Sequence, residues 1–201
     1  EEMKEAGTNV HVVSTIDDIC WTLNIRGNDI DFFPLVLSYG IITMDSFELY
    51  IDERKLDDKL KAKLAKDGVN LHPYNDIYED VKKFGSDVVA MIDPGKLNYA
   101  LFNNIPENVK TVEKRNPAIL MKAIKNPVEI ENIRKAQIKD SVAHVRFMKW
   151  LKENVGKMRI TEMSASDKLD EFRAEMGNFI RPSFEPISSF GEHGAIVHYT
   201  S

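Results

Sequence analysis

Short apolar runs alternate with amphipathic segments along residues 1–124 of the chain. Residues 10–14 form a β-branched run, and residues 47–51 alternate in character as a half-buried strand does. Leu56, Leu60 and Leu64 recur every four residues among Lys and Asp, which is typical of an amphipathic helix. This alternation of predicted strands and helices indicates an α/β layer domain.

The predicted elements of this part follow one another closely. In chain order they are a strand over 10–14, a short helix from 15, a hairpin of 35–43 and 47–51, a helix from 56 that Gly68 closes, a strand over 69–72, a weaker helix over 75–84, a strand over 88–92, a helix over 96–102 and a strand over 109–112. No internal repeat, low-complexity tract or linker interrupts them.

Longer helical patterns replace these short elements after residue 124, so we place a domain boundary between 1–124 and 125–201. Asn126, Pro127 and Glu129 supply an N-cap residue, a proline at the first helical position and an acidic residue at the third, which is close to a capping box. Apolar residues then recur at spacings that fit one helix face, to about residue 153.

A second long helix is predicted between Thr161, which supplies the N-cap hydroxyl, and Gly177, which ends the helix. Two short apolar runs follow, over 184–190 and 195–199, separated by a loop that two glycines bound. We predict that these runs are strands joined by that tight loop.

Composition places the chain among soluble globular proteins, because its 201 residues are 43% apolar and 29% charged. The 27 basic and 32 acidic residues leave a formal charge of −5, which excludes nucleic acid and anionic membranes as main partners. No apolar run approaches the roughly 20 residues that span a bilayer. Cys20 is the only cysteine, so a reducing compartment is expected, and the predicted location is cytoplasmic.

Motifs of the common phosphate-binding, serine-hydrolase, zinc-peptidase and calcium-binding classes are absent: there is no GxGxxG, GxxxxGK[ST], GxSxG, HExxH or EF-hand loop. Asp17 and Asp18 are adjacent carboxylates of the kind found in acidic nuclease sites. They stand at a predicted helix start, however, where the helix dipole alone favours acidic residues. We therefore expect them to stabilise that helix.

Three of the five histidines are expected to be structural. His11 lies in a predicted strand, His72 precedes a proline, and His144 lies within the long predicted helix. For His144 we expect no second histidine or carboxylate at a clear chelating offset.

Glu192, His193 and His198 form a denser group in the glycine-bounded loop and the run after it. Two imidazoles and a carboxylate at this spacing suit a metal or proton-transfer site. Three such residues can also occur close together by chance, and spacing alone favours this interpretation over a functional site.

Four segments in matching order resemble the Xaa-Pro aminopeptidase (aminopeptidase P) family of pita-bread metallopeptidases. Residues 188–199, SSFGEHGAIVHY, resemble the start of its catalytic core, and residues 16–29, IDDICWTLNIRGND, resemble the entry into the domain that precedes it. Residues 125–129, KNPVE, and 138–140, IKD, resemble the first catalytic-domain helix. Together the segments extend over most of the chain.

The fold that this resemblance implies has two parts. Residues 1–124 would form a non-catalytic, creatinase N-terminal-type (RNase H-like) α/β domain, and residues 125–201 would form the N-terminal, incomplete portion of a pita-bread metallopeptidase domain. The chain, which starts without Met, would be an internal fragment of a longer protein, which we call the parent. Another creatinase-type domain would precede it there.

The function implied for the parent is the hydrolytic removal of the N-terminal residue from peptides with proline in second position. The family holds two divalent metal ions, usually Mn²⁺, on two Asp, one His and two Glu that follow the GAIxHY segment. The resemblance therefore assigns no metal ligand and no cofactor-binding residue to this chain. We expect no cofactor in the chain alone and no peptidase activity from it.

His198 is the single catalytic residue that the resemblance assigns, by substrate contact or proton transfer beside the metal centre. His193 stands where the family accepts Asn or His, so we expect it to shape the loop. The expected partners are peptides with N-terminal Xaa-Pro. The sequence is also compatible with a homo-oligomeric protein. The alternative is a non-catalytic pita-bread relative that binds peptides or protein partners, against which the GAIVHY sequence argues.

Overall fold

The computed structural model describes residues 1–201, which divide into two compact units. Unit 1 is Glu1–Ile124 and unit 2 is Lys125–Ser201. None of the helices in either unit combines the length and the apolar character that crossing a membrane requires.

Unit 1 is built on one six-stranded sheet with the strand order β4-β3-β2-β1-β5-β6. The strands are β1 (Val10–Val13), β2 (Ser38–Ile42), β3 (Phe47–Ile51), β4 (Val69–His72), β5 (Val89–Ile92) and β6 (Lys110–Glu113). β2 pairs antiparallel with β1 and β3, while β1 with β5, β3 with β4 and β5 with β6 are parallel pairs. Parallel neighbours need crossover connections, and helices supply them here.

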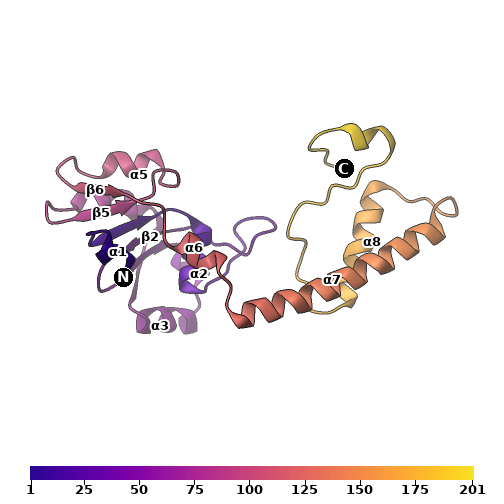
Figure 1. Cartoon of the computed structure of the whole chain (residues 1–201), viewed down its shortest axis with the longest axis horizontal. Coiled ribbons are helices and arrows are strands. Elements are labelled where there is room, and N and C mark those ends of the chain that lie inside the picture. Colours follow the sequence, from indigo (N-terminus) through magenta and orange to yellow (C-terminus); the bar gives the residue numbers. More distant parts are fainter. The chain divides into compact units, whose positions relative to one another are not determined.

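The helices of unit 1 lie on both faces of this sheet (Figure 1). They are α1 (Glu2–Glu5), α2 (Ile16–Leu23), α3 (Asp58–Lys66), α4 (Ile77–Asp80), α5 (Tyr99–Asn104) and α6 (Ala118–Ala123), with 3₁₀ turns η1 (Glu53–Lys55), η2 (Tyr74–Asp76) and η3 (Val81–Lys83). The arrangement is a three-layer α/β/α domain, which confirms the α/β class predicted from sequence.

Two hydrophobic clusters cover the two faces because successive strand residues point to opposite sides. Val12 of β1 packs in the cluster that includes Ile77 of α4 and Leu101 of α5. Its neighbour Val13 packs in the cluster that includes Ile19 of α2 and Leu64 of α3.

Local sequence signals explain both the successes and the misses of the predicted elements. The predicted hairpin is present as β2 and β3, with Ile42 opposite Phe47 across the turn. The predicted weak helix over 75–84 is instead a succession of η2, α4 and η3. The predicted helix over 96–102 begins later, as α5, because the side chain of Asn98 accepts a hydrogen bond from the amide of Leu101 and caps the helix there.

Unit 2 contains two long helices, α7 (Pro127–Asn154) and α8 (Glu162–Glu175). The predicted capping box at the start of α7 is confirmed: the Asn126 side chain accepts from the amide of Glu129, and the Glu129 side chain accepts from the amide of Asn126. After α8 the chain turns at Gly177, whose φ of +73° suits a residue without a side chain.

The prediction of strands over 184–190 and 195–199 is wrong. Neither run is a strand, and between them Gly191–Ala195 forms the 3₁₀ turn η4. A strand needs a neighbour to pair its backbone groups, and unit 2 contains no strand that could pair with either run.

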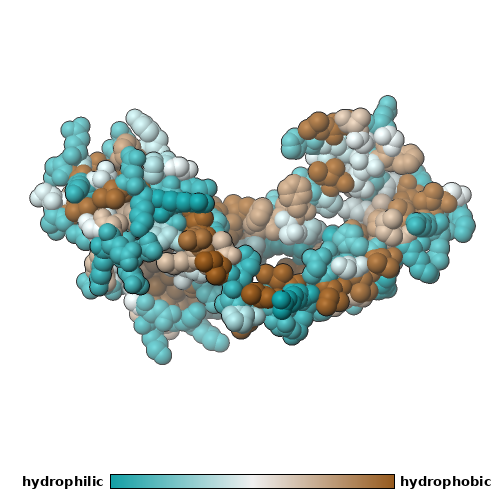
Figure 2. Space-filling model, in the orientation of Figure 1, coloured by the Kyte–Doolittle hydropathy of each residue, from teal (hydrophilic) through white to brown (hydrophobic).

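Helix α7 carries a largely uncovered apolar face. Ala143 is its only buried residue, and Figure 2 shows hydrophobic residues at the surface along the helix. The exposed large apolar residues of α7 are Val128, Ile130, Ile133, Ile138, Val142, Val145 and Met148.

Candidate functional site

The start of α8 is fixed by reciprocal hydrogen bonds at its N-terminus. Thr161 Oγ1 accepts from the amide of Ser164 at 3.1 Å, and Ser164 Oγ accepts from the amide of Thr161 at 2.8 Å. Glu162 is therefore the first residue of the helix. An acidic side chain is favoured there because the helix dipole presents partial positive charge at this end.

The carboxylate of Glu162 collects three donors from the segment 190–199. It accepts from the amide of Phe190 at 2.5 Å, from Nδ1 of His193 at 2.9 and 3.1 Å, and from the hydroxyl of Tyr199 at 2.7 Å. The rings of His193 and Tyr199 also stack, with their centroids 4.7 Å apart. One carboxylate thus ties three separate points of the segment to one helix end.

These contacts stabilise the ionised carboxylate. The hydrogen bond from Tyr199, followed by those from His193 and Phe190, lowers the pKa of Glu162 below its ordinary value. The same bond raises the pKa of the Tyr199 hydroxyl, because the phenol donates to a negative charge.

His198, the predicted catalytic residue, lies immediately before the anchored Tyr199. Its side chain is exposed, and its backbone adopts the left-handed conformation with φ of +56°. This conformation is uncommon for residues other than glycine, although histidine adopts it more often than most. The segment therefore presents the His198 imidazole at the surface of the chain.

The other members of the predicted dense group do not assemble around His198. Glu192 is exposed in η4, and His193 turns to Glu162. No group of three or more His, Cys, Asp or Glu side chains in the structure is arranged to hold a metal ion. The residues of this chain therefore do not fit a dinuclear metal centre by themselves.

Sequence reasoning missed Glu162 and Tyr199 as partners. Each residue stands beside a feature that the sequence does show: Glu162 follows a helix-capping threonine, and Tyr199 ends the GAIVHY segment. Their separation of 37 residues, however, leaves no periodicity to connect them.

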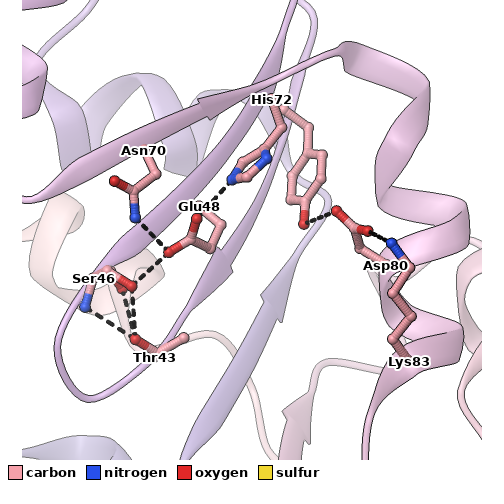
Figure 3. A network of polar contacts seen from close by, with 8 residues as sticks. Thr43, Ser46, Glu48, Asn70, His72, Asp80 and Lys83 are labelled. Carbon is pink, nitrogen blue, oxygen red and sulfur yellow. Dashed lines mark hydrogen bonds and ion pairs between the residues drawn. The ribbon is translucent and has the colours of Figure 1, made fainter.

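A second polar network lies in unit 1 (Figure 3) and accounts for His72. Glu48 in β3 accepts from Ser46 Oγ, Asn70 Nδ2 and His72 Nε2 at 2.5, 2.8 and 2.6 Å. Burial opposes ionisation of Glu48, but the hydrogen bonds from Ser46, His72 and Asn70 together lower its pKa. The ring of His72 stacks on Tyr50, at 4.9 Å between centroids. The contacts join β3 to the edge strand β4.

Known proteins resemble this chain along almost its whole length. Residues 1–129 match the Creatinase/Prolidase N-terminal domain, and residues 131–201 match metallopeptidase family M24. A probable Xaa-Pro aminopeptidase P of Neurospora crassa is 36% identical over 99% of this chain and 31% of its own length. Xaa-Pro aminopeptidase 1 of Dictyostelium discoideum is 39% identical over 99% of this chain and 32% of its own length.

A solved structure is also similar. The X-prolyl aminopeptidase of Caenorhabditis elegans, described as a cytosolic enzyme with a di-nuclear active site, has a TM-score of 0.92 and 31% identity. The similarity extends over 99% of this chain and 33% of that one. The chain thus spans about a third of the length of the relatives that it matches.

Proposed function

This chain belongs to the Creatinase/Prolidase N-terminal domain family and continues into metallopeptidase family M24, and from that premise we propose that it is part of a metal-dependent Xaa-Pro aminopeptidase. The proposed reaction is hydrolysis of the bond between an N-terminal residue and a following proline. The observation that carries the proposal is the similarity over 99% of the chain to proteins named for this activity.

The two units would have different parts in the parent. Residues 1–124 would be a non-catalytic domain, and residues 125–201 would begin the catalytic domain. The two metal ions, with Mn²⁺ as the expected species, would be held by residues in the part of the relatives' length that this chain does not span. No step through the metal is therefore assigned to residues of this chain.

His198 would contribute an imidazole at the edge of the active site. An imidazole titrates near neutral pH and can accept, hold or return a proton at a reacting group. Its exposure leaves the ring accessible to a substrate. We assign His198 substrate contact or proton transfer, and His193 the shaping of the loop through its bond to Glu162.

A proline in the second position explains why a dedicated enzyme would be needed. Proline removes the amide hydrogen of the bond to be cleaved and restricts the backbone of the residue before it. A pocket shaped for ordinary peptides therefore handles such bonds poorly. This chain holds a single cysteine and so forms no disulfide within itself, and we propose a reducing compartment such as the cytosol.

The proposal is tested by kinetics of the parent with Mn²⁺ and two peptides that differ only in having proline or alanine in second position. We expect release of the N-terminal residue from the proline peptide, loss of activity on chelation, and recovery on adding Mn²⁺. Binding of the proline peptide without cleavage, in a parent that retains its metal, would instead support a non-catalytic relative.

A further inference from the structure

We propose that Glu162 is a positioning residue for His198, an inference that rests on the proposed function. The carboxylate anchors the backbone at Phe190, the ring of His193 and the hydroxyl of Tyr199, which bracket the segment containing His198. Glu162 has no contact with His198 itself among these bonds. It would act on the imidazole through the residues on either side.

Apart from these hydrogen bonds, the segment 190–199 has few buried apolar contacts to hold it. Phe190 and Val197 are 85% and 82% exposed, so apolar packing in this chain does not fix them. The side chain of Glu162, by contrast, is only 17% exposed. Hydrogen bonds to an ionised acceptor are shorter and about twice as strong as those between neutral groups. Their removal should therefore free the segment.

The geometry at Tyr199 links the anchor to His198. The Tyr199 ring is held at its face by the stack on His193 and at its hydroxyl by Glu162. Since the peptide bond between residues 198 and 199 is planar, fixing Tyr199 limits the orientations open to His198. A left-handed backbone at a residue other than glycine costs about 1 kcal/mol or more and persists where its surroundings hold it.

The position of Glu162 also suits a permanent acceptor. As the first residue of α8, it lies where the helix dipole stabilises negative charge. The lowered pKa of its carboxyl keeps both oxygens available as acceptors through the neutral range. Glutamine has nearly the same shape but only one acceptor oxygen, so Glu162→Gln removes acceptors while it keeps the volume.

The matched control is Glu171→Gln. Glu171 lies on the same helix and is exposed, and its carboxylate pairs with Lys168 within α8 rather than with the segment 190–199. Both variants remove one negative charge from α8. A difference between them therefore reports the contacts of Glu162 and not a general effect of charge on the helix.

The first measurement uses the 201-residue chain and follows the absorbance of its tyrosines against pH. Glu162→Gln should lower the pKa of Tyr199 toward the ordinary tyrosine value, with Tyr199→Phe identifying the signal, and Glu171→Gln should not. Glu162→Gln should also speed proteolytic cleavage within 190–199 severalfold. An unchanged Tyr199 titration in a folded Glu162→Gln chain would overturn the anchoring contact.

The second measurement compares kcat and KM of the same variants in the parent. A catalytic group misplaced by about 1 Å costs roughly 100-fold, so Glu162→Gln should lower kcat 10- to 100-fold with KM and Tm little changed. An unaltered kcat would overturn the positioning role. If Glu162→Gln does not fold, Tyr199→Phe decides: it should lower kcat in the same direction, and a normal kcat would reject the proposal.

Failures of the two proposals are distinguishable. A wild-type parent that does not cleave Xaa-Pro peptides would reject the proposed function, and with it the catalytic consequence of Glu162. The tyrosine titration and the proteolysis would still decide whether Glu162 holds the segment, because neither needs turnover.

Discussion

Lys122 of α6 places its ammonium group 2.7 Å from the carboxylate of Asp18 in α2, across 104 residues of sequence. The side chain of Asp18 is 2% exposed and also accepts from Thr15 Oγ1 at 2.6 Å and Asn116 Nδ2 at 2.9 Å. Lys122 pairs with the more exposed Asp17 as well. The ion pair therefore holds α6 against α2 at the end of unit 1.

Lys122→Met should destabilise unit 1 by about 1–3 kcal/mol, because it leaves the buried Asp18 charge without its cationic partner. The loss should stay below that of a fully buried pair, since Lys122 is 30% exposed. Urea unfolding of the 201-residue chain measures it. Lys82→Met, which removes an exposed pair with Glu79, is the control and should change stability little. Equal stability of the two variants would contradict the role of the pair.

His11 in β1 is buried, at 2% exposure, and neither ring nitrogen has a hydrogen-bond partner in the structure. Burial lowers the pKa of this imidazole, and this effect outweighs the opposing influence of the nearby Asn116 side chain and Met91 backbone and of the charges of Asp93 and Asp18. The folded chain therefore binds the proton less readily than the unfolded chain, whose histidine titrates near pH 6.5. The stability that depends on neutral His11 is complete above about pH 6.5 and is lost as the pH falls below it.

The predicted consequence is a loss of stability of unit 1 as the pH falls below about 6.5. One proton taken up on unfolding corresponds to at most about 1.4 kcal/mol for each pH unit of this fall. His11→Leu should remove this loss and leave stability at pH 7 equal or higher, because it replaces an unpartnered polar group with an apolar one. His144→Gln, on the surface of α7, should retain the loss. A wild-type chain equally stable at pH 5 and 6.5 would refute this account.

Local signals made parts of the fold predictable from sequence. The start of α7 follows from Asn126 and Glu129, which lie three residues apart and satisfy each other's backbone groups. The hairpin of β2 and β3 follows in the same way from two apolar runs, over 35–43 and 47–51, and the short turn between them. The family resemblance, which covers the GAIVHY segment, indicated metal-dependent hydrolysis of Xaa-Pro peptides.

Contacts between distant residues were not predictable in this way. The local pattern predicts only that Asp17 and Asp18 stabilise a helix start, yet both also pair with Lys122, and nothing in that pattern indicates this ion pair. The bond of Glu162 to Tyr199 was missed for the same reason. The strands predicted over 184–190 and 195–199 are absent for a related reason: an apolar run does not reveal whether a partner strand is available to pair with it.

The uncovered apolar face of α7 should make unit 2 either self-associate or become locally disordered in the isolated chain. Exposed apolar area of this kind usually recruits a partner. Sedimentation should show oligomers that dissociate on dilution, and replacing Ile138 and Val145 by Lys should weaken association at least tenfold. Lys152→Glu, at the last turn of α7, is the control. Hydrogen exchange with uniform strong protection of both units in a strictly monomeric chain would contradict this expectation.

The 201-residue chain should bind no pair of Mn²⁺ ions tightly and should not cleave Xaa-Pro peptides. A two-metal centre needs several carboxylates that converge, and no such group is present in the structure. Calorimetric titration with Mn²⁺ provides the measurement, with the parent as the positive control. Two tight Mn²⁺ sites in the chain, or turnover at the rate of the parent, would contradict the expectation that the metal ligands lie outside these 201 residues.

His198→Ala in the parent should lower kcat far more than it lowers stability. A positioned imidazole contributes roughly 10²- to 10⁴-fold through proton transfer or orientation, and an exposed side chain adds little to core packing. His193→Asn should have the smaller effect: it removes the stack on Tyr199, but an amide N–H can replace the imidazole as donor to Glu162, which still holds the Tyr199 hydroxyl. Kinetics of both variants, with melting temperatures alongside, separate the two roles. Equal losses of activity, or a His198→Ala protein that simply unfolds, would mean that residue 198 supports the loop rather than the reaction.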